Sequence, residues 1–169
     1  MEMDDTLSSL AARVGEQLCR KGLLMATCES CTGGLVAAAL TAIPGSSRWF
    51  DRGFVTYSNE AKQEVLGVQS TTLQLHGAVS EATTREMAEG GLRHSHARIT
   101  LAVSGIAGPG GALPDKPVGM VCFAWAGSGL LSCSATHYFS GDRSSVRHQA
   151  VVTALQGVLD FLAGESHVV

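Results

Sequence analysis

Charged side chains are scarce in this sequence, and their scarcity excludes two broad classes of protein. Asp, Glu, Lys and Arg make up 16% of the 169 residues, against about 25% in an average globular protein. The formal net charge is −3 and the isoelectric point is near 6.0, so the chain lacks the basic field of a dedicated nucleic-acid binder. No apolar run reaches the roughly 18 residues of a membrane span. We therefore expect neither a nucleic-acid partner nor a membrane segment.

The start of the sequence is also short of positive charge. It reads Met-Glu-Met-Asp-Asp, whereas a secretory signal begins with a basic segment. The five cysteines form an odd number, and without a signal they are most simply reduced thiols. These features predict a cytoplasmic protein.

Apolar residues and glycine, by contrast, are plentiful. Hydrophobic residues account for 45% of the chain and the mean hydropathy is +0.17. A chain of this size buries about two thirds of its unfolded surface, so we expect one domain over residues 1–169 that needs no stabilising metal or disulfide. Glycine supplies 20 of the 169 residues, an excess that indicates close backbone turns of the kind that often line small-ligand sites.

Apolar spacing and breaker residues predict helices that alternate with strands, followed by a hairpin. The predicted helices cover residues 4–20, 35–40, 59–66, 80–96 and 143–163. The predicted strands cover residues 23–27, 49–57, 98–103, 118–125 and 131–139. This order predicts a three-layer α/β/α sandwich around a mixed, mostly parallel sheet with a C-terminal antiparallel hairpin. The loop over 104–117, rich in Gly and Pro, has the length of a functional loop.

Ser30 is the first candidate for chemistry, because it lies between a predicted strand and a predicted helix. Free backbone N–H groups converge at a helix N-terminus, and such donors can stabilise the oxyanion of an attacked carbonyl. Gly33 and Gly34 would let a substrate approach the backbone closely. The alternative is that Ser30 is only a helix N-cap, since serine is among the preferred capping residues.

A serine nucleophile needs a base, and no histidine lies in an obviously suitable place. Only three lysines are present, and Lys62 follows the strand that carries Tyr57. Strand-to-helix junctions of a parallel sheet meet at its carboxyl edge, so Ser30, Tyr57 and Lys62 could lie together there. A Ser-Lys pair is a known nucleophile–base arrangement. The alternative is that Lys62 is a solvated surface lysine.

Two further patterns invite other functions. Cys28 and Cys31 form a CxxC at the same strand–helix junction, which is compatible with redox chemistry but is weak evidence for zinc. Arg143 and Arg147 lie four residues apart near a predicted helix N-terminus, an arrangement suited to a phosphate group or simply to an exposed helix face. The segment 108–111 lacks the Lys-Ser/Thr of a P-loop, so we exclude an ATP-binding loop of that kind.

Seven short segments together resemble one family, the C-terminal domain of the competence/damage-inducible protein CinA, which includes nicotinamide-nucleotide amidohydrolases. The segments are ESCTGGL at 29–35, PGSS at 44–47, VTYSNEAK at 55–62, GAVSE at 77–81, SGIAGPGG at 104–111, KPVG at 116–119 and GDRSSVR at 141–147. They span nearly the whole chain. Cys28 and Arg52 depart from the family pattern, in which alanine and glycine are common, and Arg52 is large enough to alter the mouth of the site.

The resemblance implies hydrolysis of the carboxamide of nicotinamide mononucleotide to nicotinic acid mononucleotide and ammonia. It assigns Ser30 as nucleophile, Lys62 as its base and Tyr57 as a supporting residue. The residues expected to contact the nucleotide are Thr32, Gly33, Ser104, Gly105, Arg143 and Arg147. We expect no metal, no cofactor and a homo-oligomeric protein. The alternative is a non-catalytic nucleotide-binding or regulatory module of the same fold.

Overall fold

The structure, a computed structural model, describes residues 4–164 and contains one five-stranded sheet. Its strands are β1 Met25–Glu29, β2 Phe50–Val55, β3 Ile99–Gly105, β4 Met120–Gly127 and β5 Cys133–Tyr138, in the order β2-β1-β3-β4-β5. β1 pairs in parallel with β2 and β3, whereas the β3–β4 and β4–β5 pairs are antiparallel. The predicted mixed sheet with a C-terminal hairpin is confirmed, but the sheet is not mostly parallel, because two of its four pairings are parallel and two are antiparallel.

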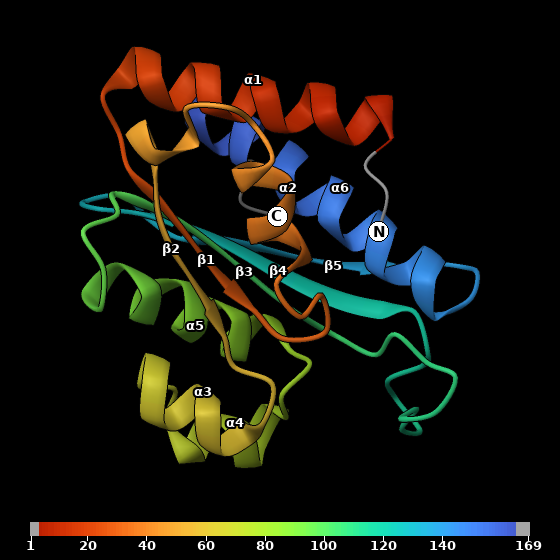
Figure 1. Ribbon diagram of the computed structural model, residues 1–169. Helices are drawn as coiled ribbons and strands as arrows, with labels where there is room; N and C mark the ends of the chain where they lie inside the picture. The colour runs from red at the N-terminus through yellow and green to blue at the C-terminus, as the bar shows by residue number, and fades with distance from the viewer. Residues whose placement is uncertain (1–3, 165–169) are drawn as a thin grey trace.

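Helices cover both faces of this sheet and make the three predicted layers (Figure 1). One face carries α1 Asp5–Lys21, α2 Leu35–Thr41 and α6 Arg143–Leu162. The other carries α5 Glu81–Arg93, with α3 Asn59–Leu66 and α4 Ser70–His76 packed beside it. The α/β/α sandwich predicted from the sequence is therefore confirmed, although α4 was not among the predicted helices.

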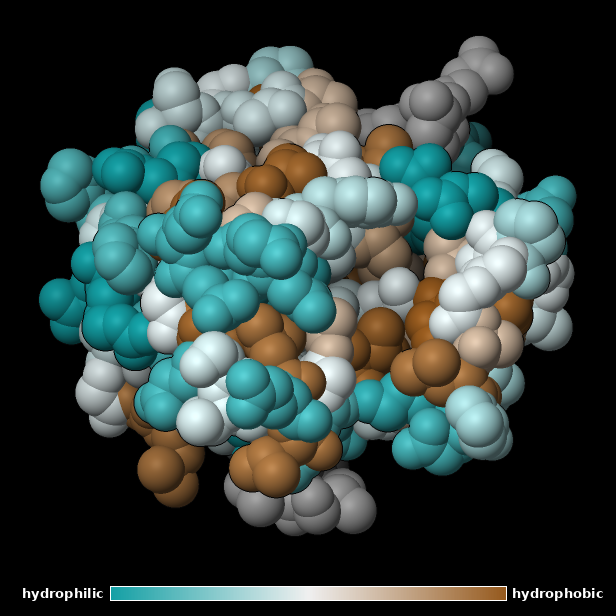
Figure 2. All heavy atoms as spheres, turned by 90° about the horizontal axis from the view of Figure 1, so that it is seen from below, coloured by the Kyte–Doolittle hydropathy of each residue, from teal (hydrophilic) through white to brown (hydrophobic). Residues whose placement is uncertain are grey.

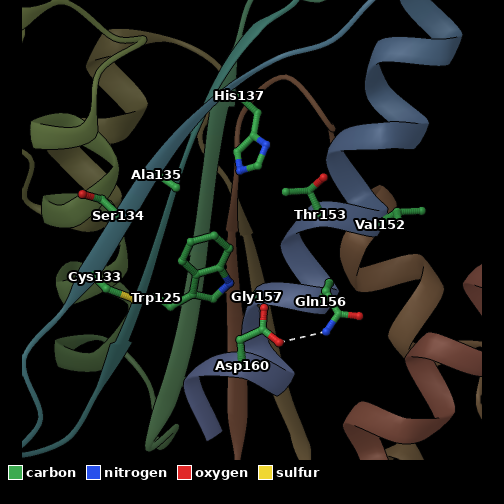
Figure 3. Close-up of a pocket in the computed structure, with 10 residues that line it drawn as sticks. All are labelled: Trp125, Cys133, Ser134, Ala135, His137, Val152, Thr153, Gln156, Gly157 and Asp160. Atoms are coloured by element: carbon green, nitrogen blue, oxygen red, sulfur yellow. Dashed lines mark hydrogen bonds between the residues drawn. The ribbon is translucent and has the colours of Figure 1, made fainter. Parts of the chain in front are cut away.

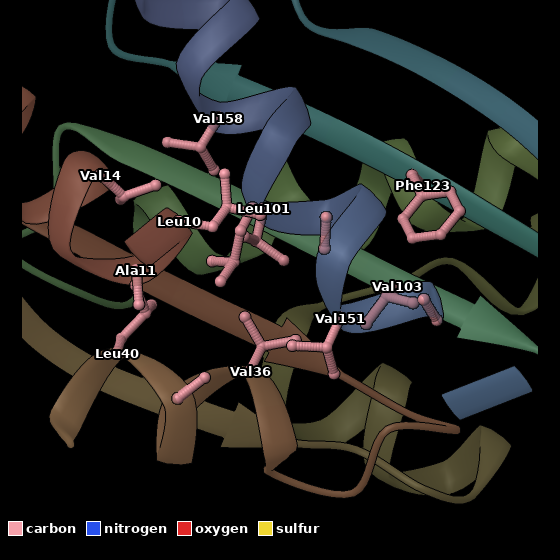
Figure 4. Close-up of a cluster of buried hydrophobic side chains, with 14 of the residues drawn as sticks. Leu10, Ala11, Val14, Val36, Leu40, Leu101, Val103, Phe123, Val151 and Val158 are labelled. Atoms are coloured by element: carbon pink, nitrogen blue, oxygen red, sulfur yellow. The ribbon is translucent and has the colours of Figure 1, made fainter. Parts of the chain in front are cut away.

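The main hydrophobic core lies between the sheet and the layer of α1, α2 and α6 (Figure 4). α1 begins where the Asp4 carboxylate accepts the Leu7 amide at 2.7 Å, and it ends at Gly22, whose left-handed conformation favours glycine. Its buried stripe of Leu7, Leu10, Ala11, Val14 and Leu18 belongs to this core, and α1 packs against α6 and α2. A smaller core, which includes Cys28, Met87 and Ala102, lies under α5.

The outer face formed by α3, α4 and α5 is not continuously apolar. Figure 2 views the molecule from this side and shows hydrophilic side chains over much of it, separate hydrophobic groups between them, and a hollow right of the centre. Leu75 on α4 is 78% exposed, which is the largest exposure of an apolar side chain on these helices. The described part of the chain contains no helix long and apolar enough to cross a membrane.

Candidate active site

Ser30 lies directly after β1, at the carboxyl edge of the sheet. Its amide donates to the carbonyl of Val103 on β3 at 3.0 Å, and only 8% of the residue is exposed. The turn 31–34 separates it from α2, whose N-cap is Gly34. The alternative that Ser30 is an N-cap is therefore wrong. The expectation that α2's first amides converge on Ser30 is also wrong, because the Glu29 carboxylate accepts the amides of Val36 and Ala37.

Lys62 reaches the Ser30 hydroxyl from α3, which lies on the opposite face of the sheet from α2 (Figure 1). Ser58 caps α3 by accepting the Ala61 amide at 3.0 Å, which places Lys62 in the first turn. The Nζ atom donates to the carbonyl oxygen of Thr56 at 2.9 Å and lies 3.0 Å from Ser30 Oγ. Lys62 is 1% exposed, so the alternative of a solvated surface lysine is wrong.

The surroundings of Lys62 make its neutral form easier to reach than that of a solvated lysine. Burial lowers the pKa of this ammonium group below its ordinary value of 10.5, and a negative charge on Cys31 would oppose this effect. Burial also raises the pKa of the Cys31 thiol to about 12, so that charge is absent at neutral pH. No Asp or Glu forms an ion pair with Lys62 among residues 4–164. A buried lysine without a counter-ion can hold a lone pair ready for a proton.

Tyr57 and Arg143 form the outer wall of the same cavity. Arg143 Nη2 donates to the Tyr57 hydroxyl at 3.0 Å, and Nη1 donates to the carbonyl of Gly108 at 2.9 Å. Tyr57 is 61% exposed. The cavity has a volume of about 230 Å³, and its lining is Ser30, Cys31, Tyr57, Lys62, Ala78, Val79, Ser104, Gly105, Ala107 and Arg143. Segments from β1, β2, β3, α3 and α6 thus meet at one small opening.

The structure brings six of the nine predicted site residues into this lining, and three lie outside it. Thr32 is fully buried, and its hydroxyl donates to the Glu29 carboxylate at 2.7 Å. Arg147 donates to the backbone carbonyls of Cys31 and Thr32, beside Gly33. The predicted substrate contacts of Thr32, Gly33 and Arg147 stay predictions that the cavity lining does not support.

Glu29 is the residue that the sequence analysis missed. It is wholly buried beside Ser30 and accepts hydrogen bonds from two backbone amides and the Thr32 hydroxyl. The sequence feature that could have identified Glu29 is its position directly after an apolar strand. A carboxylate buried there must find hydrogen-bond partners.

The two cysteines of the CxxC lie on opposite faces of the sheet. Cys28 belongs to the small core under α5, and Cys31 belongs to the main core. Both are buried, and burial raises the pKa of each thiol. The redox hypothesis, which required exposed and reactive thiols, is therefore wrong. In the described residues no group of three or more His, Cys, Asp or Glu side chains is placed to hold a metal ion.

Arg52 does not alter the mouth of the site. It lies in β2 opposite Ala26 of β1, three residues before the carboxyl end of that strand. Its guanidinium bonds to Asp51 and to the carbonyl of His94 at the end of α5. The side chain is thus absent from the cavity lining.

A larger cavity, of about 450 Å³, lies between β5 and α6 (Figure 3). Trp125 forms its floor, close to Gly157, and donates its indole N–H to the carbonyl of Ala154 at 3.0 Å. Asp160 and Gln156 are hydrogen-bonded to each other at its rim. Ser134 in its lining donates to the Glu81 carboxylate at 2.7 Å, but Glu81 itself lies outside this lining, so the size of the cavity alone does not make it the centre of the chemistry.

The fold and the site define an α/β/α-sandwich domain with a buried serine–lysine pair at the carboxyl edge of the sheet. The model of the CinA C-terminal domain matches residues 7–162, and the chain belongs to this family. A solved structure titled competence/damage inducible protein CihA, from Agrobacterium tumefaciens, superposes with a TM-score of 0.91 at 44% identity. The superposition covers 96% of this chain and 99% of that one.

Curated relatives fall into two lengths. A protein named nicotinamide-nucleotide amidohydrolase PncC, from Enterobacter agglomerans, is 52% identical over 153 residues, which are 90% of this chain and 93% of that protein. The PncC protein of Escherichia coli is 50% identical over the same shares. A competence-damage inducible protein of Symbiobacterium thermophilum is 51% identical over 164 residues, but the chain spans only 38% of its length.

Proposed function

We propose that this chain hydrolyses the carboxamide of nicotinamide mononucleotide to nicotinic acid mononucleotide and ammonia, with Ser30 as nucleophile and Lys62 as base. The observation that carries the proposal is the 3.0 Å separation between Lys62 Nζ and Ser30 Oγ inside the protein, where lysine loses its charge most readily. The names of the two PncC relatives supply the substrate. A Ser-Lys pair supplies the activation that an amide requires.

In the first half of the reaction, neutral Lys62 takes the proton of the Ser30 hydroxyl as Oγ attacks the carboxamide carbon. The resulting tetrahedral intermediate carries a negative oxygen, which backbone N–H groups can stabilise. The amide of Cys31, which lines the cavity, bonds to no other described residue and is available for this. The Lys62 ammonium then protonates the leaving nitrogen, the C–N bond breaks, and ammonia departs from an acyl-serine.

In the second half, a water molecule replaces ammonia in the cavity. Lys62, neutral again, takes a proton from this water as it attacks the acyl-serine carbonyl. The ester C–O bond breaks, Ser30 Oγ regains its proton from Lys62, and the product leaves as a carboxylic acid that gives its proton to ammonia or solvent water. The same amine therefore serves as base and acid in each half. Water is the only molecule consumed besides the nucleotide.

Recognition of the nucleotide falls to the outer wall. Arg143 carries a guanidinium at the N-terminus of α6, and both features favour a phosphate. The Tyr57 hydroxyl and the Gly108 carbonyl accept hydrogen bonds from the Arg143 guanidinium and hold it beside the cavity. Ser104 and Gly105 form the opposite wall, where the Ser104 hydroxyl donates to the carbonyl of Ala78 at 2.8 Å. We expect these residues to fix the nicotinamide ring and ribose over Ser30.

The test is to incubate the purified chain with nicotinamide mononucleotide and to measure ammonia and nicotinic acid mononucleotide together. Ser30→Ala should lose at least about a thousandfold in kcat while staying folded. Ser132→Ala is the matched control, because this serine lies outside the cavity lining. Binding of the nucleotide without ammonia release by the wild-type protein would contradict the proposal and favour a non-catalytic module.

Two expectations from the sequence are independent of this reaction. A homo-oligomeric state and a cytoplasmic location stay predictions, and neither is needed for the chemistry described above.

A further inference from the structure

The Glu29 carboxylate is fully buried yet forms no ion pair with any described Lys or Arg. Hydrogen bonds replace the counter-ion. Oε1 accepts the Thr32 hydroxyl at 2.7 Å and the Val36 amide at 2.9 Å, and Oε2 accepts the Ala37 amide at 3.0 Å. Such a charge is tolerated inside a protein only when its oxygens are satisfied in this way. The positive end of α2 adds to the stabilisation.

Glu29 performs for α2 the task that a capping side chain normally performs. The N-cap of α2 is Gly34, which makes no side-chain hydrogen bond. The carboxylate that bonds the helix amides comes instead from the strand before Ser30. One side chain therefore bonds both to Thr32 within the turn 31–34 and to the first turn of α2 that follows it. Glu29 is also fixed to β2, because its carbonyl accepts the Thr56 amide at 2.9 Å.

Arg147 holds the same turn from α6. Its Nε donates to the carbonyl of Cys31 at 3.1 Å, and its Nη2 donates to the carbonyl of Thr32 at 3.2 Å. Because a peptide group is planar and trans, the N–H of Cys31 points away from the Ser30 carbonyl, which accepts the Gly33 amide at 3.0 Å. The Cys31 amide bonds to no other described residue, and Cys31 lines the cavity beside Ser30.

We propose that Glu29 and Arg147 are positioning residues that fix the turn 31–34 between them, so that the amide of Cys31 is held ready for the oxyanion on the substrate of Ser30. This inference rests on the proposed function. It also gives Arg147 a role different from the phosphate contact predicted from the sequence, because the guanidinium is already engaged with backbone carbonyls.

Glu29→Gln tests the first positioning residue. Glutamine keeps the size of the side chain but presents an NH₂ group where a carboxylate oxygen now accepts an amide, so donor faces donor. We expect kcat to fall between about tenfold and a hundredfold, because small displacements of an oriented site have effects of this size. KM should change less than about threefold, since Glu29 does not line the cavity. A wild-type kcat in folded Glu29→Gln protein would overturn the proposal.

Glu86→Gln is the matched control for this swap. Glu86 on α5 accepts the amide of Gln69, the N-cap of α4, and the hydroxyl of Thr72. It is therefore another carboxylate that caps a helix from a different element, but it lies outside the cavity lining. Its exchange should leave kcat unchanged. An equal fall in kcat in both variants would show a general loss of structure and would overturn the positioning role.

Thr32→Val keeps the test decisive if Glu29→Gln does not fold. Valine preserves the buried shape and removes only the hydroxyl that donates to Glu29 Oε1. We expect a smaller fall in kcat, of about three- to tenfold, with KM unchanged. An unaffected kcat in this variant, when Glu29→Gln is unfolded, would count against the inference.

Arg147→Lys separates positioning from phosphate binding. Lysine cannot bond two carbonyls as a planar fork, so kcat should fall by the same factor, about tenfold, for nicotinamide mononucleotide and for nicotinamide riboside, which lacks the phosphate. A rise in KM confined to the mononucleotide would overturn the positioning role and restore the phosphate contact.

A fluorophosphonate probe that modifies activated serines distinguishes failure of this inference from failure of the proposed function. Mass spectrometry would give the rate of Ser30 labelling without any nucleotide. Labelling that is slowed in Glu29→Gln but not in Glu86→Gln supports the positioning role even if the wild-type protein leaves the mononucleotide intact. If the wild-type protein neither hydrolyses the nucleotide nor labels at Ser30, the proposed function and this inference both fall.

Discussion

The inner and outer halves of the site differ sharply in how they are held. In the inner half, Ser30 is 8% exposed and Lys62 is 1% exposed, and each is bonded to backbone groups of neighbouring elements. In the outer half, Tyr57 is 61% exposed and Arg143 begins α6 at the surface. Under the proposed function, the difference teaches that the interior of the fold would fix the reacting atoms, whereas side chains in contact with solvent would recognise the substrate.

The order of the strands explains this difference. β1 lies inside the sheet, with β2 on one side and β3 on the other. Ser30 therefore follows a strand that is hydrogen-bonded along both edges. Tyr57 follows β2, which is an edge strand. We therefore expect substitutions in the inner half to act on kcat, and substitutions in the outer half to act mainly on KM.

Lys62→Arg should have the largest effect, and it changes only the inner half of the site. Arginine keeps a positive charge but does not give up its proton in proteins. We expect kcat/KM to fall by at least about a thousandfold, measured by ammonia release with folding checked by circular dichroism. Activity near the wild-type value would mean that Lys62 acts only as a fixed charge.

Arg143→Ala should have an intermediate effect, located in the outer half. A charge-assisted hydrogen bond is worth roughly 1.5–3 kcal/mol, which corresponds to about one to two decades in kcat/KM. We expect the change in KM, and expect it to be greater for nicotinamide mononucleotide than for the riboside. Equal losses on both substrates would show that Arg143 does not contact the phosphate.

Tyr57→Phe should have the smallest effect, and it tests whether Tyr57 belongs to the outer half of the site. It removes only the hydroxyl that accepts from Arg143 Nη2, and an ordinary hydrogen bond contributes about 0.5–1.5 kcal/mol. We expect a rise in KM of about two- to tenfold with kcat nearly constant. A hundredfold loss of kcat would move Tyr57 into the inner half as a catalytic residue.

The sequence predicted the layers, the hairpin and the meeting of Ser30 with Lys62, because these depend on periodicity and on the general geometry of parallel sheets. It missed α4 for a physical reason. The N-cap of α4, Gln69, makes no side-chain cap, and its amide is bonded by Glu86 from α5. A cap supplied from another helix leaves no local signature.

The same reason explains the errors around Ser30. The first strand was predicted to end at Thr27, but β1 continues to Glu29. Glu29 can be buried there because its partners lie up to eight residues further along the chain. Ser30 was likewise predicted to lie at the N-terminus of the helix over 35–40, but the turn 31–34 separates it from α2. Tertiary hydrogen bonds to a buried carboxylate are not visible in a local pattern.

The most direct test of the account is the pH dependence of kcat/KM for the wild-type protein. Burial lowers the pKa of Lys62 from 10.5, and the neutral, basic form grows as the pH rises through that lowered value. We therefore predict that kcat/KM for nicotinamide mononucleotide rises with pH through a single ionisation below 10.5, with folding verified at each pH. A profile that is flat, or that falls over this range, would contradict the assignment of Lys62 as the base for Ser30.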